Sequence, residues 1–143
     1  MAAPLSPDLS DARRHCEGAW PEEGVCAFVN GPHAWRFVPL RNVAQAAHEA
    51  DPKAFPRSGR TSFLVEPLEW MALEREAVGR EVCLVHSHVD GPATLSAWDL
   101  STFTIDGHPL LPHLSLVVLS VRDSRVVAEG RWRFVCGGWA AAL

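Results

Sequence analysis

A short apolar run that ends in two histidines constrains the fold of this chain more than any other feature. The segment Val82–Val85 reads as a buried strand, and it continues directly into His86, Ser87 and His88. In extended backbone the side chains at positions i and i+2 lie on the same face, so the two imidazoles can reach one metal ion together. The sequence therefore predicts a buried strand with a metal site at or just past its end.

A second polar pair follows the histidines after seven residues. Ser96 and Asp99 are three positions apart, so on a helix they are neighbours. A helix packed beside the strand end can bring Asp99 to the same ion as His86 and His88. Three protein ligands with the fourth position left to water are typical of catalytic zinc sites. The S-x-x-D pattern also matches a helix capping box, which satisfies free backbone amides at a helix start.

These residues can supply most of the chemistry of a zinc hydrolase. Zinc lowers the pKa of a bound water towards neutrality, so that hydroxide forms at working pH. The hydroxyl of Ser96 can stabilise the oxyanion that develops on an attacked carbonyl. A carboxylate that takes the water proton and passes it to a leaving amine is still needed, and it has to come from elsewhere in the chain.

The composition is that of an ordinary globular protein, and we expect one domain over 1–143. Of the 143 residues, 48% are hydrophobic and 21% are charged. The formal net charge of -4 provides no basic surface, so we expect no nucleic-acid partner. The longest apolar run, around 114–121, is far below the ~20 residues that cross a bilayer, so we expect no membrane partner. The N-terminus lacks a secretory pattern and the four cysteines form no C-x-x-C pair, which favours a cytoplasmic, reduced protein.

The apolar runs and turn signals predict an α/β (α+β) domain with a central mixed sheet flanked by helices. Asn30-Gly31 is a strong hairpin signal between two strands, and Pro67 opens a helix at a permitted first-turn position. We expect strands at 25–29, 35–38, 61–65, 82–85, 114–121 and 126–135, helices at 8–17, at 67–78 and from 96, and an irregular loop over 42–60.

The residues around the histidines resemble the JAMM/MPN zinc metalloprotease family in its bacterial form. The family signature, H-x-H followed by seven residues and S-x-x-D, is matched at every position, and HSHVDGPATLSAWD is similar to the bacterial version of the motif. The resemblance implies an MPN-like fold in which His86, His88 and Asp99 bind one Zn²⁺. It also implies that Ser96 assists at the oxyanion.

The general base of that family is a glutamate in an early P-x-E-x-C-G motif, and residues 21–26 read P-E-E-G-V-C. Without a gap, Glu23 falls on the catalytic position. Glu22 is the competitor, because a shift of one residue would select it instead. The resemblance continues through the V-P-x-x-N-x-A segment of the family, at 38–44. Val89 and Leu95 stand where bacterial members usually have prolines, which bears on loop shape rather than on metal binding.

Family members hydrolyse the bond after the C-terminal glycine of ubiquitin or ubiquitin-like proteins. The resemblance therefore implies a peptidase or isopeptidase whose partner is a ubiquitin-like or sulfur-carrier protein. Its thin glycine tail would lie in a narrow groove as an extended strand. A non-catalytic MPN scaffold and a phage-tail-assembly peptidase are the alternatives, whereas a deaminase-like zinc site is disfavoured because such sites use a C-x-x-C pair.

Several residues near the motif allow more than one role. Trp98 is expected to pack rather than to catalyse, and the spacing of His108 and His113 supports no second metal site. Four apolar residues can either dock a ubiquitin-like partner or pack in the core: Phe103, Ile105, Leu110 and Leu111.

Overall fold

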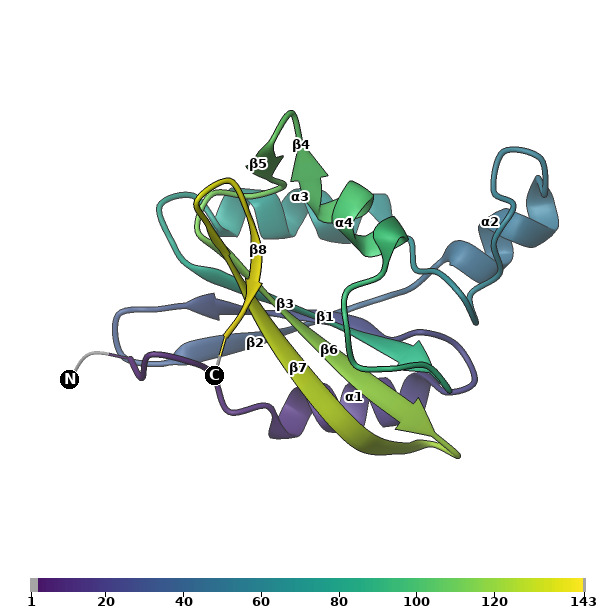
Figure 1. Ribbon diagram of the computed structural model, residues 1–143, viewed down its shortest axis with the longest axis horizontal. Coiled ribbons are helices and arrows are strands. Elements are labelled where there is room, and N and C mark those ends of the chain that lie inside the picture. The colour runs from purple at the N-terminus through teal and green to yellow at the C-terminus, as the bar shows by residue number, and fades with distance from the viewer. Residues whose placement is uncertain (1–2, 143) are drawn as a thin grey trace.

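The structure is a computed structural model that describes residues 3–142. Its central element is one mixed sheet of six strands (Figure 1). The strand order is β2-β1-β3-β6-β7-β8, in which β3 and β6 run parallel and the other neighbours run antiparallel. The predicted α/β (α+β) fold with a central mixed sheet is confirmed. The strands of this sheet are β1 (Val25–Asn30), β2 (Trp35–Leu40), β3 (Val82–Val89), β6 (Leu114–Arg122), β7 (Arg125–Val135) and β8 (Gly138–Ala141). A separate hairpin joins β4 (Thr104–Ile105) to β5 (His108–Pro109). The helices are α1 (Ser10–Ala19), α2 (Ala44–Ala50), α3 (Pro67–Glu76) and α4 (Ala97–Phe103).

Helices cover both faces of the sheet, and each face has its own core. On one face, α1 buries Ala12 and Cys16 in a cluster with Phe28 and other residues of β1, β3 and β6. On the opposite face, Leu73 of α3 and Phe103 of α4 share a cluster with alternate residues of the same strands. Figure 1 shows α1 on one side, α3 and α4 on the other, and α2 set out to the side of the sheet.

The strand β3 lies between β1 and β6 and is covered on both faces, which explains its continuously apolar sequence. It extends to Val89, past the predicted end at Val85, so that both histidines of the motif are strand residues. Leu84 belongs to the core beneath α3 and α4. Because side chains alternate along a strand, His86 and His88 face the same side as Leu84.

The segment 42–60, predicted as an irregular loop, contains the helix α2, so that part of the prediction is wrong. The side chain of Asn42 accepts a hydrogen bond from the backbone N–H of Ala44 at 2.9 Å. This bond satisfies one of the free donors at the helix start. Four alanines among seven residues then favour the helical turns.

The predicted strand at 61–65 is also wrong. Within the described residues the segment forms one isolated bridge, between Val65 and Asn42, rather than a ladder. The Asn42 side chain binds the backbone groups that a neighbouring strand would otherwise pair: its Nδ2 donates to the Ser62 carbonyl at 3.1 Å, and its Oδ1 accepts from the Leu64 N–H at 2.9 Å. The chain here is extended, but it is bound to the Asn42 side chain and to the backbone of Arg41 and Val43 rather than to a strand.

The other predicted elements are present with shifted ends. The hairpin turn at Asn30-Gly31 joins β1 to β2 in antiparallel register, and the helix opened by Pro67 ends before Gly79, whose φ of 72° suits glycine. The strand β8 and the short β4–β5 hairpin are additions that the apolar pattern does not predict. Trp139 of β8 contacts Phe134 of β7, with ring centroids 5.2 Å apart.

The four cysteines are all free thiols, three of them buried and Cys136 exposed. Their isolated positions in the sequence agree with this finding. No helix within residues 3–142 has the length and apolar character that a membrane span requires.

Candidate metal centre

Three side chains from β3 and α4 converge at the end of the sheet. The Nε2 atoms of His86 and His88 are 3.2 Å apart. The carboxylate of Asp99 contacts both rings, with Oδ1 3.2 Å from Nε2 of His86 and Oδ2 3.0 Å from Nε2 of His88. In the described part of the chain, this is the one group of His, Cys, Asp or Glu side chains placed to hold a metal ion. The structure thus brings the three predicted ligands together.

The spacing of these donor atoms suits a tetrahedral zinc ion. Zinc–nitrogen bonds of about 2.0–2.1 Å at tetrahedral angles separate two ligand nitrogens by roughly 3.3 Å. The observed separation of the two imidazole nitrogens is 3.2 Å. Two imidazoles and one carboxylate also form a donor set that zinc prefers, and they leave one of four positions for water.

A hydrogen bond of His88 and the burial of His86 both favour metal binding by these rings. Nδ1 of His88 lies 2.9 Å from the carbonyl oxygen of Pro92 and donates to it, which leaves Nε2 free as a ligand. His86 is fully buried between Phe63 and Phe103, with ring centroids 5.0 Å and 5.5 Å from its own. Burial lowers the pKa of His86 despite its contact with Asp99, so the ring stays in the neutral form that binds metals.

Asp99 is both a helix-capping residue and the third candidate ligand. Ser96 is the N-cap of α4: its Oγ accepts from the Asp99 N–H at 3.0 Å, and its own N–H donates to Oδ2 of Asp99 at 2.9 Å. Burial would raise the pKa of Asp99, but hydrogen bonds with His86 and His88 outweigh it and lower that pKa. The capping box therefore holds an ionised carboxylate against the imidazoles, so the two readings of S-x-x-D are compatible.

Glu23 precedes β1 by two residues and lies beside the three candidate ligands. In the antiparallel ladder Val25 is opposite His86, and the backbone hydrogen bond from Ser87 to Gly24 continues the pairing by one residue. Glu23 therefore comes level with His88. The side chain is 7% exposed. Burial raises the pKa of Glu23 to about 8, although the neighbouring His88 counteracts part of this effect.

The structure separates the two glutamates that the sequence left as competitors. Glu23 is two residues before Val25, so an extended chain directs both side chains to the face that carries His86. Glu22 is half-buried and its carboxylate lies against Gly59, where an added Cβ would come within 2.2 Å of Oε1. The geometry therefore favours Glu23 over Glu22 as the carboxylate of the site.

The sequence motif does not reveal that Asn42 connects Glu23 to the rest of the site. Its Nδ2 donates to the Glu23 carbonyl at 2.8 Å as well as to Ser62, and its Oδ1 accepts from Ala44 and Leu64. The side-chain amide thus uses both donors and both acceptor positions. The V-P-x-x-N-x-A segment contained this residue, but its spacing gives no sign of the four partners.

Ser87, between the two histidines, has a related role. Its Oγ accepts from the Gly24 N–H at 2.7 Å, and its own N–H donates to the Gly24 carbonyl at 2.9 Å. Ser87 has no exposed surface. It therefore fixes the strand that carries the histidines against the segment that carries Glu23.

A cavity of about 220 Å³ adjoins the metal centre. Phe63 is in contact with the ring of His86, and Trp98 precedes Asp99 on α4. Trp98 is 46% exposed, and the guanidinium of Arg57 lies 4.7 Å from its ring centre. The lining combines α2 and the segments after it with α4: Ala44, Ala54, Phe55, Pro56, Arg57, Ser62, Phe63, Leu64 and Trp98.

The four apolar residues considered for docking do not form one surface. Phe103 and Leu111 are buried core residues, and Leu110 is partly buried against the same core. Ile105 is 54% exposed at the tip of the β4–β5 hairpin. Core packing therefore accounts for most of this group.

Comparisons with known proteins identify the fold and the family. No functionally curated protein matches the sequence. A solution structure of a protein from Desulfitobacterium hafniense has 19% identity and a TM-score of 0.62, over 99% of this chain and 90% of the other. One from Salinibacter ruber has 26% identity and a TM-score of 0.52, over 99% and 88%. Residues 6–135 match the family described as prokaryotic homologs of the JAB domain, and the chain belongs to this bacterial branch of the JAMM/MPN proteins.

Proposed function

We propose that the chain is a zinc-dependent JAMM-type peptidase or isopeptidase, which hydrolyses the bond after the C-terminal glycine of a ubiquitin-like or sulfur-carrier protein. The observation that carries the proposal is the cluster of His86, His88 and Asp99 with the buried carboxylate of Glu23 beside it. When bound, Zn²⁺ would acidify a water molecule and polarise the scissile carbonyl.

Glu23 is the residue that we assign to proton transfer. Burial raises its pKa to about 8 in the metal-free site, so its carboxylate binds a proton more strongly than an exposed glutamate does. It would take a proton from the attacking water and deliver that proton to the leaving amine. Arg57 opposes the effect of burial, and a bound metal ion would do the same, which preserves an ionised fraction near neutral pH.

Ser96 is suited to stabilise the oxyanion. Its Oγ accepts a hydrogen bond from the Asp99 N–H, which leaves the hydroxyl hydrogen free to donate. The residue is exposed at the start of α4, where a substrate carbonyl can approach it. Loss of such a donor typically lowers the rate by about 10²–10³.

The proposed substrate class is supported by the family and by the extended backbone that lies beside the metal centre. The extended segment 61–65 runs past the metal centre with Phe63 against His86. A glycine tail has no side chains, so it can pair with extended backbone at such close range. We therefore place the tail along this segment, with the scissile bond over the metal centre.

The proposal is tested by metal analysis together with cleavage of defined fusions. Purified protein should contain one zinc per chain, and it should release a reporter fused after the Gly-Gly end of ubiquitin or of a sulfur-carrier protein. Asp99→Ala should lose the zinc, whereas Glu23→Gln should keep the zinc and lose cleavage. Asp90→Asn is the matched control, because Asp90 is exposed and pairs with Arg60.

A zinc-loaded protein that binds these fusions without cleaving them would instead support the partner-binding scaffold. Wild-type protein without stoichiometric zinc after reconstitution would contradict the metal assignment itself.

A further inference from the structure

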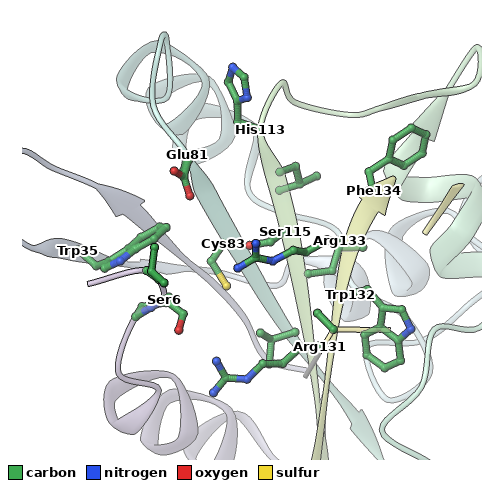
Figure 2. Close-up of a pocket in the computed structure, with 16 residues that line it drawn as sticks. Ser6, Trp35, Glu81, Cys83, His113, Ser115, Arg131, Trp132, Arg133 and Phe134 are labelled. Carbon is green, nitrogen blue, oxygen red and sulfur yellow. The ribbon is translucent and has the colours of Figure 1, made fainter. Parts of the chain in front are cut away.

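A second cavity, of about 340 Å³, lies on the sheet face that carries α1. This face is the opposite one from the metal centre, since Cys83 and Val117 belong to the core cluster of α1. The cavity is beyond the part of the face that α1 covers, next to the residues that lead into the helix. Figure 2 shows its centre at Cys83 and Ser115, with Trp35 and Ser6 on one side.

Two arginines of β7 form the other side of the cavity. Arg131 and Arg133 are two residues apart, so they project on the same face of the sheet. In the β6–β7 ladder they pair with Val117 and Ser115. Figure 2 shows the side chain of Arg133 reaching toward Ser115 and Cys83, and that of Arg131 along the lower edge of the cavity.

The positive charges of Arg131 and Arg133 both influence the thiol of Cys83, on the floor of the cavity. Burial raises the pKa of the Cys83 thiol to about 11, while Ser115, Arg131 and Arg133 each act to lower it. Both guanidinium groups are therefore close enough to Cys83 to influence it.

Arg133 has no ion-pair partner among residues 3–142, whereas Arg131 has one. No hydrogen bond or ion pair links Arg133 to another residue within 3–142. Arg131 binds Glu129 through Nε at 3.1 Å, which leaves its terminal nitrogens available. Glu81 and His113 line the other end of the cavity, and no ion pair joins Glu81 to either arginine in the described chain.

The hydroxyl of Ser115 adds a third donor. It donates to the Val82 carbonyl at 3.5 Å, the outer limit of a hydrogen bond, and it also contacts the thiol of Cys83, a weak hydrogen-bonding group. The hydroxyl is therefore free to turn toward a better acceptor. Guanidinium groups donate and never accept, and their planar forks match the oxygen atoms of carboxylate and phosphate groups.

We propose that this cavity is an oxyanion-binding site, in which Arg131, Arg133 and Ser115 hold the carboxylate or phosphate group of a ligand. It is separate from the metal centre and does not depend on the hydrolase assignment. The site would give the protein a second ligand or a second point of contact on the face away from the metal.

The test is a titration of ¹⁵N-labelled protein, followed by NMR, with inorganic phosphate and with succinate at constant ionic strength. Saturable shifts are expected at the amides of Ser115, Arg131 and Arg133. Arg133→Gln should weaken binding by about tenfold, as expected for loss of a charged hydrogen-bond donor. Glu81→Gln should strengthen it, because a nearby negative charge is removed.

The matched control is Arg122→Gln, since Arg122 is exposed near the other end of the β6–β7 pair. This variant should bind as the wild type does. Tighter binding of phosphate than of succinate would indicate a phosphorylated ligand, and the reverse order a carboxylate; either supports the site. Shifts that do not saturate, that chloride reproduces, or that are equal in the Arg133 and Arg122 variants would overturn it.

Discussion

The carboxyl group of Glu23 shows how one buried residue can couple folding to proton uptake. No hydrogen bond or ion pair reaches its side chain from residues 3–142, and burial is the main cause of its raised pKa. A carboxylate at this position therefore lacks the local stabilisation that Asp99 receives from two histidines. His88 and Arg57 offset part of the cost of an ionised Glu23, and a metal ion bound nearby would offset more of it.

The metal-free protein should lose stability as the pH rises from about 5 to 8. The pKa of Glu23 is about 8 in the folded state against 4.5 ordinarily, so in this window the folded state holds a proton that the unfolded state has released. The free energy of unfolding then falls as pH rises, on the order of 2–4 kcal/mol in total. Chemical denaturation across this pH range, in the presence of a chelator, measures the change in the free energy of unfolding.

Glu23→Gln should flatten this pH dependence, because glutamine does not titrate. Glu22→Gln is the control and should retain the wild-type slope. If the slope persists in the Glu23 variant, another group is responsible for it.

Ser96 combines a capping role with the proposed oxyanion role, and two substitutions separate them. Ser96→Ala removes both, and its loss of the cap should cost about 1 kcal/mol of stability. Ser96→Asp keeps a capping acceptor but has no hydroxyl to donate. We expect unfolding temperatures to recover in the aspartate variant while peptidase turnover stays low; recovery of turnover as well would mean that the cap alone matters.

At the scale of elements, one side chain decides how the segments after β2 are arranged. Asn42 binds the start of α2, the extended segment 61–65 and the carbonyl of Glu23 through a single amide. The sequence prediction assigned a loop to the first of these segments and a strand to the second. The helix was missed because its seven residues are mostly alanine and polar side chains, with no clear apolar period. The strand was wrong because apolar patterning reports burial, whereas here Asn42 binds backbone groups that a strand would pair.

Asn42→Asp tests this arrangement, since aspartate keeps the two acceptor contacts and loses the two donor contacts. The carbonyls of Glu23 and Ser62 would lose their partner, and we expect about 1–3 kcal/mol of destabilisation for the pair. Turnover should fall more than zinc content, because Glu23 shifts while the histidines on β3 do not. Equal losses of zinc and turnover would show that the whole site, rather than Glu23, depends on Asn42.

At the scale of the whole molecule, the candidate ligands connect two layers of the fold. His86 and His88 belong to the central strand β3, whereas Asp99 belongs to α4, which packs above the sheet. A bound ion would therefore hold α4 against the sheet.

Removal of the metal should lower the thermal stability of the protein. Zinc at about a thousandfold excess over its dissociation constant stabilises a folded state by about 4 kcal/mol. Calorimetry with and without a chelator measures this shift, and Asp99→Ala should be insensitive to the chelator. A chelator effect that is as large in this variant would place the stabilising metal elsewhere.

The sequence alone determined the buried strand, the three candidate metal ligands and the cap of α4, because these depend on local spacing along one strand and one helix. The mixed sheet followed from the apolar runs and turn signals along the whole chain. Only the tertiary structure placed Glu23 beside the candidate ligands and Glu22 against Gly59, revealed the four contacts of Asn42, and placed two arginines at a cavity on the opposite face. The places of Glu23 and of the arginines depend on the register of strands distant in the chain, and the contacts of Asn42 depend on segments that approach it in space. Neither leaves a periodic pattern in the sequence.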